Sequence, residues 1–251
     1  MEALTTVEKA IDVLFHLHSE SGARGVTAIS RALGAPKSST HRLLSALSRR
    51  ALLEKDDRGR YRPGVGLVAL GLGALDREPV VVAARPVLEA EAHSLEETVF
   101  LVAARAGRII VLDKAEGSGF LRAAPRVGAA VPVHATAVGK LYLGLGEGAI
   151  PMPRGALERF SDETLTDVAS LKVEVARAAE RGFAVSIDEW IPGLSVVAAP
   201  ILAAAAGGRM LAALAVAAPT PQMRSLGIGE IGRRSIAAAE RIAARLAGVS
   251  T

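Results

Sequence analysis

The clearest chemical pattern in this sequence is a group of hydrogen-bond donors and cations in the segment 34–47. Winding the chain from Pro36 as a helix, at about 100° per residue, places Ser38, His41, Arg42 and Ser45 on one side and the leucines on the other. Such side chains can reach base edges and phosphates in the major groove of DNA. A solvated helix surface explains the same pattern, so the neighbouring elements must decide between the two interpretations.

Two shorter helices and a turn are predicted to position this face. Residues 7–18 have the apolar spacing of a helix, and Thr27 is a predicted N-cap for a second helix over 28–33. Gly34 then ends that helix in the left-handed conformation. A short helix, a glycine-containing turn and a second helix with a cationic outer face together predict a helix-turn-helix.

A basic hairpin follows this motif directly. Two extended runs, 52–55 and 60–63, flank the turn sequence Asp56-Asp57-Arg58-Gly59. A hairpin in this place is a wing, which commonly reaches the adjacent backbone or minor groove. Because two independent elements agree, the sequence favours DNA binding. The predicted DNA-contacting residues are Thr27, Lys37, Ser38, Ser39, Thr40, His41, Arg42, Ser45, Arg58, Arg60 and Arg62.

The distribution of charge supports a polyanionic partner. Residues 1–77 contain 12 Lys or Arg against 8 Asp or Glu, whereas residues 78–251 contain 18 of each. Aromatic residues make up 3% of the chain, which argues against a base-stacking surface for single strands. The absence of cysteine excludes disulfides and thiolate metal sites. With no signal peptide and no long apolar run, we expect a soluble, cytoplasmic protein.

The remainder of the chain predicts an α+β module. Helices are expected over 81–96, 134–145, 167–181 and 228–246, and a linker helix over 67–75. Strands are expected over 98–104, 109–114, 194–202 and 210–217, the last two joined at Gly207-Gly208. Neighbouring hairpins with helices at their edges predict an antiparallel sheet flanked by helices.

Catalytic residues are not expected. Asp188 and Glu189 are adjacent, and neighbouring strand residues point to opposite faces, so we interpret them as loop charges or ion-pair partners. His134 is expected to be a structural histidine. The other histidines lie on separate predicted helices without zinc-ligand spacing, so no metal or other cofactor is predicted. We therefore expect that the protein is not an enzyme.

Motifs in both halves resemble one family, the IclR-type bacterial transcriptional regulators. The matching segments are 35–44, 59–62, 132–140, 181–185 and 189–200, in the same order as in the family. The resemblance implies a winged helix-turn-helix over 1–65, a linker helix over 66–78 and a GAF-like effector-binding domain over 79–251. It also implies a dimer or dimer of dimers, with the DNA domains paired by the first and linker helices, on a palindromic operator.

The resemblance further implies a small-molecule pocket in the second domain. Family members that bind small organic acids tend to have Asp at the position of Ser186, Cys at Val196, and Ser at Ala215 and Ala217. Because this chain keeps one hydroxyl there, we expect a less polar effector, aromatic or acyl-like, with polar contact coming from backbone N–H groups at the start of the 134–140 helix. The positions implied to line the pocket are Phe120, Ala123, Val131, Ala137, Val138, Ser186, Val196, Ala215 and Ala217.

The leading hypothesis is a ligand-responsive transcriptional regulator, a repressor of a catabolic operon. Three alternatives stay open at this point. The alanines and valines of the implied pocket could simply fill a core. The second domain could serve oligomerisation without a ligand, or the chain could be a small-molecule enzyme with a vestigial DNA domain.

Overall fold

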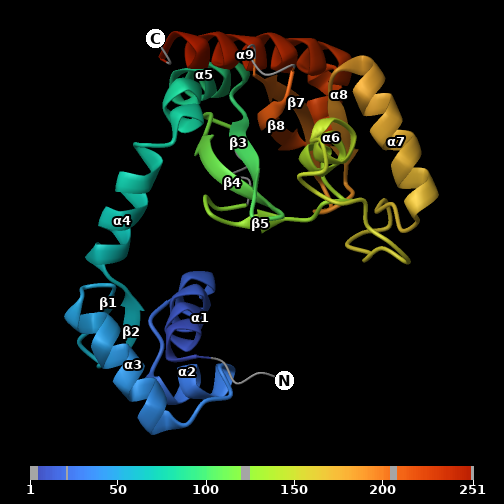
Figure 1. Cartoon of the computed structure of the whole chain (residues 1–251). Helices are drawn as coiled ribbons and strands as arrows, with labels where there is room; N and C mark the ends of the chain where they lie inside the picture. Colours follow the sequence, from blue (N-terminus) through green and yellow to red (C-terminus); the bar gives the residue numbers. More distant parts are fainter. Residues whose placement is uncertain (1–4, 21, 120–124, 204–207, 250–251) are drawn as a thin grey trace. The chain divides into compact units, whose positions relative to one another are not determined.

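The chain divides into two compact units, Met1–Arg77 and Glu78–Thr251. The computed structural model describes residues 5–20, 22–119, 125–203 and 208–249 (Figure 1). No helix within these described ranges is both long and apolar enough to cross a membrane.

The first unit is a small helical core with a hairpin. Thr5 caps the first helix through a capping box, in which its hydroxyl accepts from the Glu8 N–H at 3.2 Å. Leu17, Leu44 and Tyr61 are among the apolar side chains that fill the core. The elements are α1 (Thr6–Ser19), α2 (Val26–Ala32), α3 (Lys37–Arg49), β1 (Leu53–Lys55), β2 (Tyr61–Pro63) and α4 (Val65–Leu75).

Helices α2 and α3 and the β1–β2 hairpin form the predicted winged helix-turn-helix. Gly34 has φ +59, so it provides the left-handed turn between the two helices. Strands β1 and β2 pair antiparallel, with Glu54 opposite Arg62. The prediction for Thr27 as a cap was wrong: α2 begins after Gly25, whose extended backbone precedes the helix without a side-chain cap.

The linker helix α4 starts two residues earlier than predicted. Gly64 precedes the first residue of the helix, and only glycine fits there, because a Cβ would lie 2.4 Å from the Ala51 carbonyl oxygen. Gly71 and Gly73, which interrupt the apolar sequence, do not interrupt the helix. None of the residues of α4 is buried.

The second unit is built on one six-stranded antiparallel sheet in the order β5-β4-β3-β8-β7-β6. The predicted α+β class is confirmed. The elements are α5 (Pro79–Leu95), β3 (Thr98–Arg105), β4 (Arg108–Ala115), β5 (Ala130–Val131), α6 (Ala137–Leu145), α7 (Val168–Arg181), β6 (Ala184–Ile187), β7 (Leu194–Leu202), β8 (Met210–Pro219), α8 (Thr220–Leu226) and α9 (Ile228–Val249).

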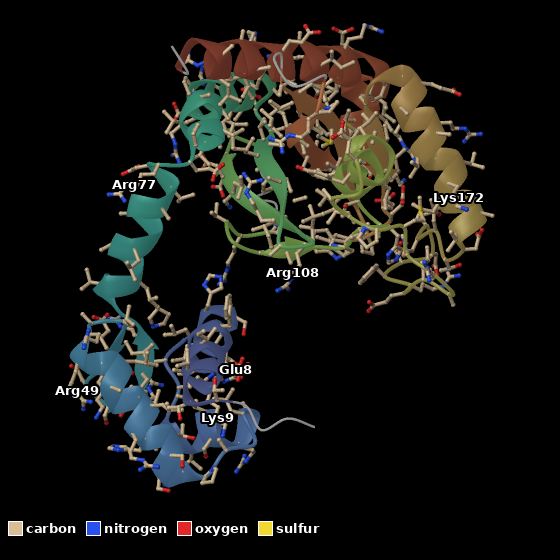
Figure 2. The ribbon with its side chains drawn as sticks, viewed as in Figure 1. Glu8, Lys9, Arg49, Arg77, Arg108 and Lys172 are labelled. Carbon is tan, nitrogen blue, oxygen red and sulfur yellow. The ribbon has the colours of Figure 1, made fainter. Side chains whose placement is uncertain are left out.

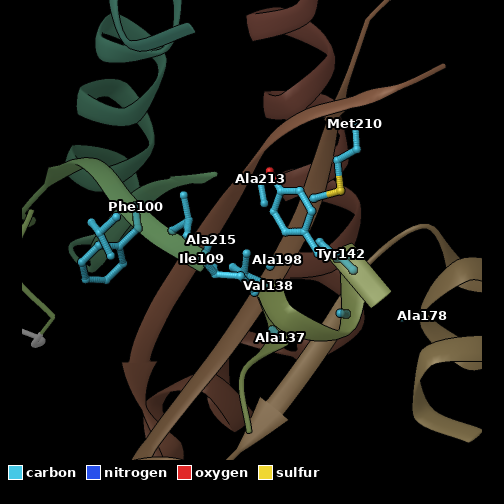
Figure 3. Packing of buried hydrophobic residues seen from close by; sticks show 14 of the residues in the cluster. Phe100, Ile109, Ala137, Val138, Tyr142, Ala178, Ala198, Met210, Ala213 and Ala215 are labelled. Atoms are coloured by element: carbon cyan, nitrogen blue, oxygen red, sulfur yellow. The ribbon is translucent and has the colours of Figure 1, made fainter. Parts of the chain in front are cut away.

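Helices cover both faces of this sheet. Helices α5 and α9 pack on one face, and α6 packs on the other with α7 beside it (Figure 1). The buried Glu91 carboxylate on α5 bonds to Arg234 and Arg241 on α9, at 2.5 Å each, so it joins the two helices of the first face. On the second face, Val138 and Tyr142 of α6 pack against Phe100, Ala198 and neighbouring strand residues (Figure 3).

The second unit differs from the prediction at the start of α6 and in its short elements. Helix α6 begins at Ala137 and not at His134, because Thr136 caps it by accepting from the Gly139 N–H at 3.1 Å. The short strand β6 and helix α8 were not predicted, since neither has a run long enough to show a period. Gly207, part of the predicted hairpin turn, lies outside the described residues.

Candidate functional site

The predicted cationic face of α3 is exposed to solvent. Lys37, Ser38, His41 and Arg42 are exposed, and Ser39 and Ser45 are half-buried. These six residues come together on one helix, as the periodicity requires. We refer to them as the recognition face.

Thr40 does not belong to this face. Its side chain is fully buried, and its hydroxyl donates to the Pro36 carbonyl oxygen at 3.2 Å. Its inclusion among the DNA-contacting residues was therefore wrong. The residue lies on the leucine side of the helix, which the helical period itself indicates.

The cations of the recognition face are not neutralised by the protein. Within the part of the chain that the structure describes, Lys37, His41 and Arg42 form no ion pair. Arg49, labelled on α3 in Figure 2, forms none either. The first turn of α3 has no acidic residue, and Pro36 offers no side-chain cap. The first backbone N–H groups of α3 and the positive end of its helix dipole can therefore bind an anion such as phosphate.

The wing arginines differ in how far their charge is available. Arg60 pairs with Asp56 at 2.7 Å, and Arg62 pairs with Glu54 at 2.8 Å across the hairpin. Hydrogen bonds from the backbone N–H and side chain of Arg60 lower the pKa of Asp56, so this pair stays ionised. Arg58, at the exposed turn, has no ion-pair partner among the described residues. Thr27 is exposed on α2.

The second unit contains a small apolar cavity between the sheet and α6. It has a volume of about 50 Å³ and is partly open to solvent. The register of the strands explains which sheet residues face the cavity. Ala217 on β8 lies opposite Val196 on β7, and Val196 lies opposite Ser186 on β6, so the three side chains share one face of the sheet. The lining residues are Phe100, Val102, Val111, Pro125, Val131, Thr136, Val138, Trp190, Leu194, Val196, Ala215 and Ala217.

Five of the positions implied by the family resemblance lie in this lining: Val131, Val138, Val196, Ala215 and Ala217.

Two other implied positions, Ala137 and Ser186, do not line the cavity, and two lie outside the described residues. Ala137 is buried in the surrounding apolar cluster without lining the cavity. Ser186 is buried one strand further out, opposite Val196. Phe120 and Ala123 lie outside the described residues.

The other lining residues were not predicted. For two of them, the alternation of side chains along a strand could have indicated their place. Phe100 and Val102 alternate along β3 and therefore reach the same face as the implied residues of β8, opposite Ala215 and Ala213. Trp190 has no such signal, because it lies in the loop between β6 and β7. Its place in the wall depends on how that loop crosses the sheet.

The lining offers little to a polar ligand. The Thr136 hydroxyl is already used, since it donates to the Pro132 carbonyl oxygen at 2.6 Å and accepts from the Gly139 N–H. The other polar group of the lining side chains is the Trp190 indole N–H. A charged group brought into this cavity would lose water without gaining side-chain partners, so the cavity suits an apolar ligand.

A buried ion pair lies beside this cavity. Lys140 on α6 is 1% exposed, and its ammonium donates to Glu189 at 2.5 Å and to the Val185 carbonyl oxygen at 2.9 Å. Burial raises the pKa of the Glu189 carboxyl, and the Lys140 ammonium opposes that rise. As expected, Glu189 is an ion-pair partner and Asp188 a loop residue, with φ +56.

His134 has the structural role that was predicted. Its Nε2 lies 2.8 Å from the Glu158 carbonyl oxygen, and its ring stacks on Phe160 with centroids 5.5 Å apart. Across the described residues, no three His, Asp or Glu side chains lie together as metal ligands.

Both units of the chain match domains of known proteins. Residues 6–57 match the IclR helix-turn-helix domain, and residues 72–244 match the C-terminal domain of the bacterial transcriptional regulator IclR. The HTH-type transcriptional regulator BhcR of Paracoccus denitrificans is 29% identical over 95% of this chain and 86% of its own length. The HTH-type transcriptional repressor AllR of Escherichia coli K12 is 26% identical over 90% and 86%.

Solved structures give the same result for the fold. An IclR transcriptional regulator from Alicyclobacillus acidocaldarius superposes with a TM-score of 0.80, at 27% identity over 100% of both chains. An IclR homologue from Microbacterium hydrocarbonoxydans, solved in complex with 4-hydroxybenzoate, superposes with a TM-score of 0.79, at 23% identity over 97% of this chain and 100% of its own. The relatives are named as transcriptional regulators and repressors, in agreement with the expectation that this chain is not an enzyme. The chain belongs to the IclR family of bacterial transcriptional regulators.

Proposed function

We propose that the protein represses a catabolic operon by binding a palindromic operator as a dimer, or as a dimer of dimers, and that a small apolar effector controls this binding. The observation that carries the proposal is the exposed, unpaired recognition face of α3 beside a basic wing. A separate unit with an apolar cavity supplies the ligand response.

In this proposal α3 enters the major groove and the wing contacts the backbone beside it. Arg42 and His41 lie where side chains reach base edges, whereas Ser38, Ser39 and the start of α3 suit a phosphate. Arg58 is the wing residue whose charge is best available to DNA, because Arg60 and Arg62 already have carboxylate partners.

Exposed apolar side chains in the first unit support the dimer. Val7 and Phe15 on α1 are 67% and 68% exposed, and Val65 and Leu70 on α4 are 67% and 65% exposed. An apolar face of this kind is normally covered by a partner. A second copy of the chain is the partner we propose. Two recognition faces related by a two-fold axis would match the two half-sites of a palindromic operator.

The cavity supports an effector of aromatic or acyl type. Its lining is apolar, and the Microbacterium hydrocarbonoxydans homologue was solved in complex with a single-ring aromatic compound, 4-hydroxybenzoate. Because the described lining has no side-chain partner for a carboxylate, we propose an uncharged effector for this chain. An effector that binds one arrangement of the second units better than another shifts the population between states with different half-site spacing.

The experiment that tests the DNA part is a genome-wide map of the binding sites of the full chain, followed by titration of the recovered duplex. We expect a palindromic site and an affinity that falls linearly on a log scale with salt. Enriched sites without two-fold symmetry would contradict the dimeric arrangement.

A second candidate function deserves a test because the cavity is small. At about 50 Å³ it holds little more than a water molecule, so the second unit could serve oligomerisation without any effector. A thermal-shift screen with phenol, 4-ethylphenol and octanol, which are uncharged near neutral pH, separates the two. A ligand of the native state raises the melting temperature, and a protein without an effector shows no shift with any compound.

A further inference from the structure

We infer that Trp190 is the specificity-determining gate of the apolar cavity: its side chain narrows the cavity in the free protein, and an aromatic effector enters by displacing it while the loop backbone stays in place. This inference rests on the proposed effector function of the same cavity.

The cavity is too small for an aromatic ring. Its volume is about 50 Å³, whereas an apolar protein cavity that holds one benzene ring measures about 150 Å³. A ligand with one aromatic ring therefore requires roughly 100 Å³ more space than the free protein provides. Part of the wall must move to create it.

Moving most of the wall residues would cost a large amount of folding free energy. Phe100, Val196 and Ala215 belong to paired strands inside the sheet, and Val138 belongs to α6, which packs on that sheet. Shifting any of these would break backbone ladders or close packing. Trp190 and Pro125 are the half-buried lining residues that lie in loops. Trp190, between β6 and β7, is the larger of the two, and its indole can rotate about two side-chain bonds whereas the proline ring is fixed to the backbone.

The backbone on the N-terminal side of Trp190 is held firmly. The neighbouring Glu189 pairs with Lys140 at 2.5 Å, and its carbonyl oxygen accepts from the Thr164 hydroxyl at 2.5 Å. The Asp188 carboxylate accepts from the Thr220 hydroxyl at 2.6 Å.

The other side of the loop is tied in the same way. The Gly193 N–H donates to the Asp188 carboxylate at 2.8 Å, and the Gly193 carbonyl oxygen accepts from the Thr220 N–H at 2.9 Å. Because both sides are anchored to the sheet and to α6, we expect the Trp190 side chain to rotate without the loop opening.

This arrangement makes Trp190 a size filter. The space that the indole leaves on rotation limits how large an effector the cavity accepts. Single-ring compounds then fit, and two-ring compounds do not unless the indole is removed. Trp190 is the one tryptophan in the chain, so its fluorescence reports its own displacement.

The experiment measures tryptophan emission of the full chain during titration with phenol and with 4-ethylphenol, in parallel with melting temperature. We expect the emission maximum to move to longer wavelength with the same midpoint as the rise in melting temperature, because the indole passes from an apolar wall towards water. A rise in melting temperature with unchanged emission would overturn the gate.

Calorimetric titration with 2-naphthol tests the size filter independently of fluorescence. We expect the Trp190→Ala chain to bind 2-naphthol at least tenfold more tightly than the wild type, and Trp190→Phe to fall between them. Equal affinities in all three would overturn the inference while the effector function stands. If the wild-type chain responds to none of the single-ring compounds, both the inference and the aromatic effector are wrong, whereas operator binding is unaffected.

Discussion

Arg42 is the residue on which we expect recognition of the operator's base sequence to depend most. It is exposed on α3 and has no ion-pair partner among the described residues, so its five donors are available to a base edge or a phosphate. We predict that Arg42→Ala weakens binding to the operator by about 1–3 kcal/mol and leaves binding to random duplex nearly unchanged. Competitive titration of the two duplexes measures this difference.

The matched variant Arg58→Ala separates specificity from general attraction. Because Arg58 lies at the tip of the wing, its loss should weaken operator and random duplex equally and reduce the salt slope by about one. Arg177→Ala, in the second unit and paired with Glu174, is the control and should change neither. If Arg42→Ala and Arg58→Ala behave alike, the assignment of roles is wrong.

Gly139 is the described glycine of the second unit at which an added Cβ would make the shortest contact. A Cβ at this position would lie 1.7 Å from the Val133 carbonyl oxygen, so the first turn of α6 can pass the preceding loop only with glycine. We predict that Gly139→Ala destabilises the second unit by about 1–3 kcal/mol or more, measured by denaturant unfolding.

Gly248→Ala is the control for this change. It makes the same substitution near the end of α9, where a Cβ meets no atom within 4 Å. We expect no loss of stability there, since alanine favours helix over glycine by roughly 0.5–1 kcal/mol. Similar losses in both variants would contradict the packing argument.

At the scale of elements, the Lys140–Glu189 pair joins α6 to the loop that follows β6. Removing one member leaves the other buried without a counter-charge, so Lys140→Met should cost about 3–5 kcal/mol near pH 8. The double variant Lys140→Met/Glu189→Gln removes both charges and should recover much of that loss. Unfolding of the three chains in denaturant measures these differences.

The pH dependence of Lys140→Met gives a second, independent readout. Burial raises the folded pKa of the Glu189 carboxyl above its ordinary value of 4.5, and removing the ammonium removes the opposing effect. The folded chain then holds a proton that the unfolded chain releases, so stability falls as pH rises above 4.5. We therefore expect a smaller deficit at pH 5 than at pH 8. A deficit that is independent of pH would contradict the buried charge as its cause.

The elements that sequence analysis predicted well are those with long, regular periods. Helix α7 and strand β7 match their predicted ranges within a residue, because a full amphipathic period or a long apolar run defines each of them. Strand β6 and helix α8 are too short to show a period. Trp190 could not be placed at the cavity, because loop positions depend on the pairing of distant strands.

At the scale of the whole molecule, the apolar faces of α1 and α4 predict how the chain assembles. Phe15→Glu or Leu70→Glu places a charge on a face that we propose is covered by a second copy. We expect either variant to shift the chain towards monomer in sedimentation and to weaken binding to a two-half-site operator at least tenfold.

Val173→Glu is the control for the assembly prediction. Val173 is 51% exposed on α7, so the same charge is added to an exposed valine outside the proposed interface. Sedimentation and operator affinity should not change. An unchanged oligomeric state in Phe15→Glu and Leu70→Glu alike would show that these faces are not the interface.

In the proposed function, a ligand bound in the apolar cavity of the second unit controls DNA binding by the recognition face of the first unit. The most direct test is the affinity of the full chain for its operator over a series of salt concentrations, with and without a saturating compound from the thermal-shift screen. We predict a steep linear fall of log affinity with log salt, and a change of at least tenfold in affinity when the ligand is added at fixed salt. Affinity that is indifferent to both salt and ligand would contradict the account.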